Sequence, residues 1–176
     1  MLAHAPRQTA PQDSLNIGRR EMSVGRFKGF GPLKTPVDLL EKIRHDFARL
    51  RAAPTDAYAA FDFVVSAYHM LNWLHPNDTA GRETEESQNS LLQVCSHLAN
   101  GAKHFEATAR KHKSVRNVVD EKGAFQRDAF QSDAFQVGGL FVELDGQAAA
   151  MHGARLEAMD LAEKVLTHWE ADPRLC

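Results

Sequence analysis

The sequence predicts a mainly α fold, a four-helix bundle with a small β-hairpin inserted before the last helix. Three observations predict it. Long segments with apolar residues at helical spacing end at prolines or loops. The connections after the first two helices are short, which favours antiparallel neighbours. A β-branched segment runs into Asp145-Gly146, a dipeptide typical of a two-residue hairpin turn.

The chain has 176 residues, which is enough for one domain with a sizeable core. We expect residues 35–176 to form this domain, with residues 109–150 as an irregular insertion that contains the hairpin. Residues 1–34 are expected to be a disordered or extended basic tail. The tail has a net charge of +4, whereas the whole chain has −2. Only the tail therefore has the excess positive charge that favours contact with nucleic acid. A change of composition at Met22 favours this residue as an alternative translation start.

Composition predicts a cytoplasmic protein that is not embedded in a membrane. The two cysteines do not form a disulfide framework, and no N-terminal segment resembles a secretory signal. No apolar run reaches the length of a membrane span. The sequence has no phosphate-binding glycine loop and no zinc motif, so we expect no cofactor and no metal ion.

The first two helices have clear boundaries. The first is expected over residues 35–51, with Thr35 as its N-cap and Pro36 in its first turn. The second covers residues 57–74. It ends at His75-Pro76, because a residue before proline avoids the helical region.

The second half of the chain mixes helices and strands. A third helix is expected over residues 83–108, since acidic residues in its first turn match the helix dipole. Residues 140–144 are expected to form a strand, with residues 147–151 as its return strand and residues 115–119 as a third candidate. The last helix is expected over residues 154–171.

A repeat of period five, Ala-Phe-Gln, begins at Ala124, Ala129 and Ala134. Three copies are too short for a solenoid, and a period of five places the phenylalanines on no single face of a strand or helix. Two interpretations stay open. The repeat is either a looped excursion whose phenylalanines dock on the bundle, or a segment that binds a partner.

The second helix is nearly apolar all round, and Asp62, Ser66 and His69 interrupt it at spacings of four and three. These spacings place them on one narrow face of the helix. Buried polar groups are costly unless they are paired, so this line requires partners. Either it forms a functional site, or it is a hydrogen-bonded network that fixes the register of the helices.

A second polar line on the next helix, formed by His97, Asn100 and His104 at spacings of three and four, offers such partners. Together the two lines would form a metal-independent phosphodiesterase-type cleft. Histidine is suited to proton transfer near neutral pH, and amide and ammonium groups can hold a phosphate. The catalytic candidates are therefore His104, His69 and Asp62, and the substrate-binding candidates are Asn100, Lys103, His97 and Trp73. His97 and His104 are about 10 Å apart along the helix, too far to share one metal ion.

The segments 60–74, 95–105 and 141–146 resemble a family of uncharacterised bacterial and phage helical proteins. The most specific part is Ala-Asn-Gly-Ala-Lys-His-Phe at residues 99–105. More distantly, the helical layout is similar to HEPN domains, small helical bundles of which many are RNases in toxin–antitoxin and phage-defence systems. Their motif is an arginine, four to six residues that include a polar one, and a histidine. His104 matches the histidine and Asn100 the polar residue, but no arginine stands at the required spacing.

The resemblance implies an HEPN-like RNase that acts in a toxin or phage-defence context, with RNA as its partner. The alternative is a non-catalytic interaction or structural module that uses the helical bundle and the phenylalanine repeat as contacts. Its partner would be another protein or a second copy of the chain.

Overall fold

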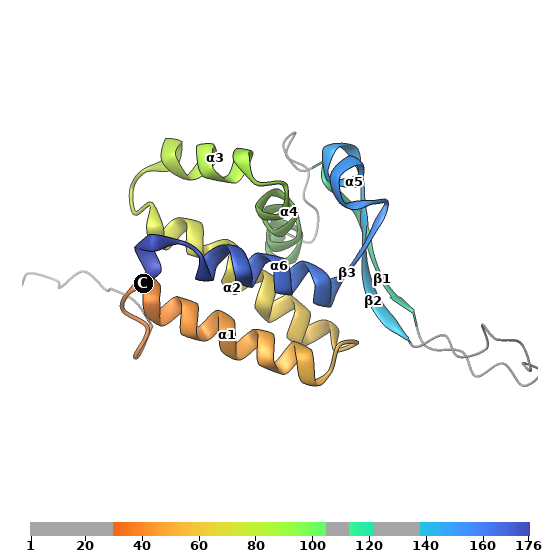
Figure 1. Cartoon of the computed structure of the whole chain (residues 1–176), viewed down its shortest axis with the longest axis horizontal. Coiled ribbons are helices and arrows are strands. Elements are labelled where there is room, and N and C mark those ends of the chain that lie inside the picture. Colours follow the sequence, from red (N-terminus) through yellow and green to blue (C-terminus); the bar gives the residue numbers. More distant parts are fainter. Residues whose placement is uncertain (1–29, 105–112, 122–137) are drawn as a thin grey trace, which may run out of the picture.

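Six α-helices and three strands are present in the residues that the computed structural model describes, which are 30–104, 113–121 and 138–176. In chain order they are α1 (Pro36–Ala52), α2 (Ala57–Leu74), α3 (Thr79–Gln88), α4 (Ser90–His104), β1 (Val115–Glu121), β2 (Gly139–Leu144), α5 (Gly146–His152), β3 (Arg155–Glu157) and α6 (Ala158–Glu170), followed by a short 3-10 turn, η1 (Pro173–Leu175). The described part of the chain is therefore mainly helical with a small antiparallel sheet at one side (Figure 1). The phenylalanine repeat and most of the basic tail lie outside these residues.

Helices α1 and α2 begin and end close to where the sequence predicts. Thr35 accepts a hydrogen bond from the backbone N–H of Asp38, and the Asp38 carboxylate accepts from the backbone N–H of Thr35, which completes a capping box. The side chain of Asp56 caps α2. The aromatic rings of Phe47 and Phe63, 6.2 Å apart, lie at the contact between the two helices.

The prediction of one continuous helix over residues 83–108 is wrong in its first half. The chain forms α3 and α4 instead, with extended backbone at Asn89 between them. The Asn89 Oδ1 accepts hydrogen bonds from the backbone N–H groups of Leu91 and Leu92 at 2.9 and 3.4 Å. A side chain that caps the next helix in this way competes with helix continuation, and this explains the break. Residues 105–108 of the predicted helix lie outside the described residues.

The predicted hairpin at Asp145-Gly146 is also wrong. Asp145 is the N-cap of α5, with its Oδ1 accepting from the Gly146 N–H at 2.8 Å, and Gly146 has a φ of +54°. The alanine-rich segment 147–151 forms a helix and not the return strand, in line with the high helix propensity of alanine. The third strand of the sheet is β3, and the last helix consequently starts at Ala158.

The sheet has the order β1-β2-β3, and both strand pairs are antiparallel. Strand β1 confirms the candidate strand over residues 115–119. It pairs with β2 so that Val118 lies opposite Val142. Strand β2 places Leu140, Val142 and Leu144 in the core.

The core is formed by α1, α2, α4 and α6 together with β2 and β3. Its largest fully buried side chains include Ile43, Phe63, Leu92 and Trp169, one from each of these four helices. Among the described residues, no helix combines the length and apolar character that crossing a bilayer requires.

Candidate functional site

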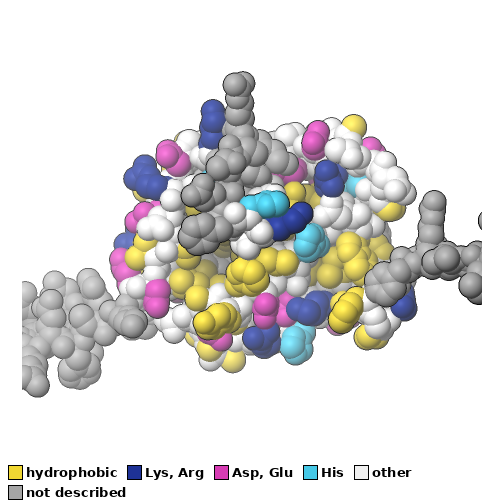
Figure 2. Space-filling view, turned by 180° about the vertical axis from the view of Figure 1, so that it is seen from behind, with side chains coloured by type: hydrophobic (Ala, Val, Ile, Leu, Met, Phe, Trp, Pro, Cys, Tyr) yellow, Lys and Arg dark blue, Asp and Glu magenta, His cyan; other side chains and the backbone are white. Residues whose placement is uncertain are grey.

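A groove of about 530 Å³ with mixed polar and apolar walls lies between α2 and α4, and one side chain of α3 also lines it. We call it the polar groove. Its lining side chains are Phe61, Val65, Tyr68, His69 and Asn72 from α2, Arg82 from α3, and Ala99, Asn100, Ala102 and Lys103 from α4. None of them is acidic. Figure 2 shows histidine and basic side chains gathered at the middle of one face of the molecule, next to hydrophobic ones.

The polar groove brings together members of both polar lines that the sequence predicts. His69 comes from the line on α2, and Asn100 and Lys103 come from α4. On α4 the two residues are three apart, so they lie on neighbouring positions of one helix face. The two helices therefore do bring polar side chains together, as predicted. Only some of the predicted residues line the groove, however.

The orientation of His69 is set by a chain of hydrogen bonds that begins on α3. The Nη1 of Arg82 donates to the Oδ1 of Asn72 at 2.6 Å, and the Nδ2 of Asn72 donates to the Nδ1 of His69 at 3.2 Å. Because Nδ1 is an acceptor here, a neutral His69 ring carries its proton on Nε2.

The electrostatics of the groove favour the same neutral state. Partial burial lowers the pKa of His69 below its usual value, and the positive charge of Lys103 lowers this pKa further. The ring is therefore neutral at neutral pH and offers an Nε2–H donor.

Arg82 and Lys103 give the groove its positive charge. In the described part of the chain, neither of them forms an ion pair with a carboxylate. Arg82 contacts the amide of Asn72 instead, and its Nε–H has no hydrogen-bond partner among the described residues. Two cations without acidic partners beside one groove are suited to an anionic ligand.

The other two members of the α2 line, Asp62 and Ser66, face α1 instead. The Nη1 of Arg49 donates to the Oδ2 of Asp62 at 2.8 Å, so this carboxylate orients neither His69 nor His104. The Ser66 hydroxyl donates to the Oδ2 of the fully buried Asp46 at 2.8 Å, and Lys42 also bonds to this carboxylate. Asp62 and Ser66 therefore form hydrogen bonds with α1 and share no site with His69, and that these bonds fix the helix register stays a prediction.

The α2 line lies at the border between two helix faces. Ser66 and His69 are about 60° apart around the helix axis, and Asp62 lies between them, only about 20° from His69. Helix geometry therefore separates Ser66 from His69, whereas the hydrogen bond from Arg49 decides where Asp62 lies. One face packs on α1, and the other, with Val65 and Asn72, lines the groove.

The remaining predicted site residues do not line the groove. The Nδ1 of His97 accepts from the backbone N–H of Val115 at 3.0 Å, which fastens β1 to α4. His104 is the exposed last residue of α4, directly after Lys103. Trp73 is partly buried against the core.

Sequence reasoning missed Arg82, Asn72 and Tyr68. Asn72 could have been found, because it lies three residues after His69 on the same helix. Arg82 gives no such signal. It reaches the groove only because α3 folds back beside α2, a tertiary contact that residue spacing does not encode.

Comparison of the chain with protein-family models, with curated proteins and with solved structures found no match. The resemblance to bacterial and phage helical proteins and to HEPN domains therefore stays a prediction. Within residues 30–104, 113–121 and 138–176, no three His, Cys, Asp or Glu side chains are grouped closely enough to hold a metal ion.

Proposed function

We propose that this protein binds single-stranded RNA in the polar groove. The observation that carries the proposal is the pair Arg82 and Lys103, two cations without a carboxylate partner in the described residues, at a groove with aromatic side chains. Proteins that bind single-stranded nucleic acid combine a positive groove with aromatic rings on which bases stack.

Four polar side chains and one aromatic ring of the groove have defined roles in this proposal. Arg82 and Lys103 hold phosphate oxygens, and the Nε2–H of His69 donates to the same phosphate. Phe61, which is 49% exposed, offers its ring to a base. The amide nitrogen of Asn100 donates to the backbone carbonyl of Ser96 at 2.8 Å, which leaves its Oδ1 to accept from a ribose 2′-hydroxyl.

A second candidate function is HEPN-like cleavage of the bound RNA. In this proposal α1, α2, α4 and α6 correspond to the predicted HEPN-like four-helix bundle. Cleavage requires a group that accepts a proton, whereas His69 has Nδ1 bonded to Asn72 and a proton on Nε2. His104, adjacent to Lys103 and exposed, is then the residue assigned to proton transfer.

The binding test measures the fluorescence anisotropy of a short labelled single-stranded RNA with the full-length protein. Arg82→Gln combined with Lys103→Gln should weaken binding by at least about tenfold, because charge-assisted hydrogen bonds to phosphate are lost. Lys164→Gln, at an exposed position on α6, is the matched control and should leave affinity unchanged. Equal affinities of the wild type and the double variant would reject the proposal.

The cleavage test follows the same RNA on a gel over time. Loss of cleavage in His104→Ala with unchanged RNA affinity would assign proton transfer to this residue. Cleavage that persists in His104→Ala would remove it from the mechanism. RNA that is bound and stays intact with the wild type would identify a non-catalytic RNA-binding protein.

A further inference from the structure

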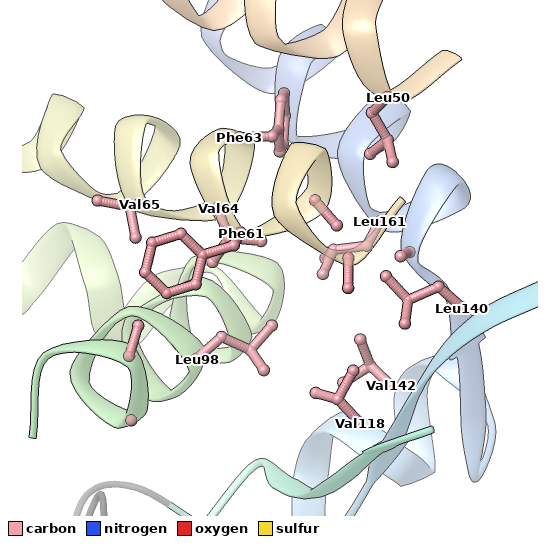
Figure 3. A pocket seen from close by; sticks show the side chains of 15 residues that line it. Leu50, Phe61, Phe63, Val64, Val65, Leu98, Val118, Leu140, Val142 and Leu161 are labelled. Carbon is pink, nitrogen blue, oxygen red and sulfur yellow. The ribbon is translucent and has the colours of Figure 1, made fainter. Parts of the chain in front are cut away.

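An apolar cavity of about 330 Å³ lies beside the polar groove, between α2, α4, α6 and the sheet. Figure 3 shows Val64 from α2, Leu98 from α4, and Val118 and Val142 from the strands around this open space. All of the side chains that line it are apolar. A volume of this size is at the lower end of the range for small-molecule pockets.

The cavity and the polar groove adjoin each other, and we call the two together the trough. Phe61 and Val65 on α2 and Ala102 on α4 line both of them. The trough follows one face of α2 from Ala57 to Asn72, a length of about 22 Å. Its walls are apolar toward the start of α2 and polar toward the end.

We propose that this trough binds a fatty acid, with the alkyl chain in the apolar cavity and the carboxylate at Lys103 and Arg82. The lining residues of the cavity offer no polar side chain that would orient a hydroxyl, an amide or a ring nitrogen. If a methylene group takes about the space of one water molecule in the liquid, about 30 Å³, the cavity accommodates up to about ten methylene groups. The two cations provide the charge that complements one carboxylate.

This proposal goes beyond RNA binding and does not depend on it, because the alkyl chain would occupy an apolar cavity to which the RNA proposal assigns no phosphate contact. The two ligands would nevertheless use the same two cations. A bound fatty acid is therefore expected to compete with RNA, which would make the lipid a regulator of RNA binding.

The first test is titration calorimetry of decanoate with the full-length protein, wild type and two variants of Gly101. Gly101 lines the cavity, and a Cβ built there meets no atom within 4 Å, so the position has open space for a first added carbon. Gly101→Leu fills part of the cavity and should weaken decanoate binding by at least about tenfold. Gly101→Ala, which gains the same helix propensity benefit but adds one methyl group, should change affinity by less than about twofold.

The second test separates the headgroup from the chain by comparing decanoate with decanol. The wild type should bind decanoate at least about tenfold more tightly, and Lys103→Gln should remove most of this difference. Equal binding of the two ligands to the wild type, or unchanged affinity in Gly101→Leu, would overturn the proposal.

A third measurement decides between an external ligand and the chain's own aromatic side chains. A triple variant, Phe125→Ser, Phe130→Ser and Phe135→Ser, should leave decanoate affinity unchanged. A large gain in affinity would show that the repeat is the native occupant and would overturn the proposal. Gly101→Leu should also keep its RNA affinity, so a failure of fatty-acid binding can be told apart from a failure of the proposed function.

Discussion

Two clusters of charged residues meet at the end of α2, and they differ in how completely their charges are paired. In the first, which we call the ion-pair cluster, His75 and Arg174 both contact Glu85, with His75 Nε2 at 2.6 Å and Arg174 Nη2 at 2.7 Å. Arg174 also donates from Nε to the Oδ1 of Asp172 at 2.9 Å. The second is the polar groove, where Arg82 contacts an amide and not a carboxylate.

The pKa shifts separate the two clusters in the same way. Burial would raise the pKa of Glu85, but hydrogen bonds from Arg174 and His75 outweigh it and leave the pKa below its usual value. The hydrogen bond from Arg174 likewise lowers the pKa of Asp172. In the groove, burial and Lys103 lower the pKa of His69, so its charged form is disfavoured. Mutually satisfied charges indicate a structural role, whereas uncompensated positive charge is typical of a binding site.

The largest expected effect on stability comes from Arg174→Met, which breaks the ion-pair cluster. It leaves two carboxylates without their main partner and should lower the free energy of unfolding by about 2 kcal/mol. This is less than for a fully buried pair, because the Arg174 side chain is 41% exposed. Urea denaturation measures the loss, and RNA affinity should not change.

The matched control is Arg44→Met. Arg44 is exposed to a similar extent and pairs with Glu41 and Glu170 on the surface. Its loss should cost less than about 1 kcal/mol. Equal costs for Arg44→Met and Arg174→Met would remove the distinction between the ion-pair cluster and an ordinary surface pair.

Lys103→Met should show the opposite pattern to Arg174→Met. The variant removes a charge that disfavours protonation of His69 and has no acidic partner in the described residues, so stability should change by less than about 0.5 kcal/mol. RNA affinity should fall by about fivefold to tenfold in anisotropy measurements. A clear loss of stability with unchanged RNA affinity would place Lys103 among the structural charges.

Sequence patterns predicted those parts of the fold that local chemistry decides. Helices α1 and α2 follow from Thr35, Pro36 and the proline after His75, all of which act within a few residues. The errors arose where one local signal has two uses. Asp145-Gly146 fits both a hairpin turn and a helix N-cap, and the alanines that follow favour the helix.

The site was predicted only in part, because residue spacing gives the face of a helix but not its neighbour. His69, Asn100 and Lys103 lie at one groove, as two facing polar lines would require. Asp62 was predicted in the same site, but its carboxylate forms an ion pair with Arg49 on α1. Arg82 reaches the groove from α3. Its position depends on the turn between α2 and α3, which the spacing of residues within a helix does not predict.

A smaller effect should follow from Asn72→Asp, which tests how the groove controls His69. The new carboxylate would accept from Arg82 and lie next to the ring nitrogen that Asn72 now contacts. An adjacent negative charge favours the imidazolium, so the pKa of His69 should rise by about one unit. NMR titration of the ring measures it. Asn117→Asp on β1 is the control, and an unchanged His69 pKa would contradict the hydrogen-bond chain.

The smallest expected effect is the pH dependence of stability that His69 contributes. Its pKa is lower in the folded protein than in the unfolded chain, so between these two values the unfolded chain binds more protons and stability rises with pH. The stability that the neutral His69 ring contributes is fully present above the pKa of the unfolded chain, about 6.5. It is lost as the pH falls toward the lower pKa of the folded protein. His69→Gln should therefore flatten the dependence of unfolding free energy on pH just below 6.5.

The slope at lower pH, where Glu85 and Asp172 become protonated, should remain, because that slope comes from the ion-pair cluster. His168, whose pKa is also lowered mainly by burial, accounts for the slope that persists near pH 6 in the variant. An identical profile for His69→Gln and the wild type would mean that the groove does not hold this ring in its neutral state.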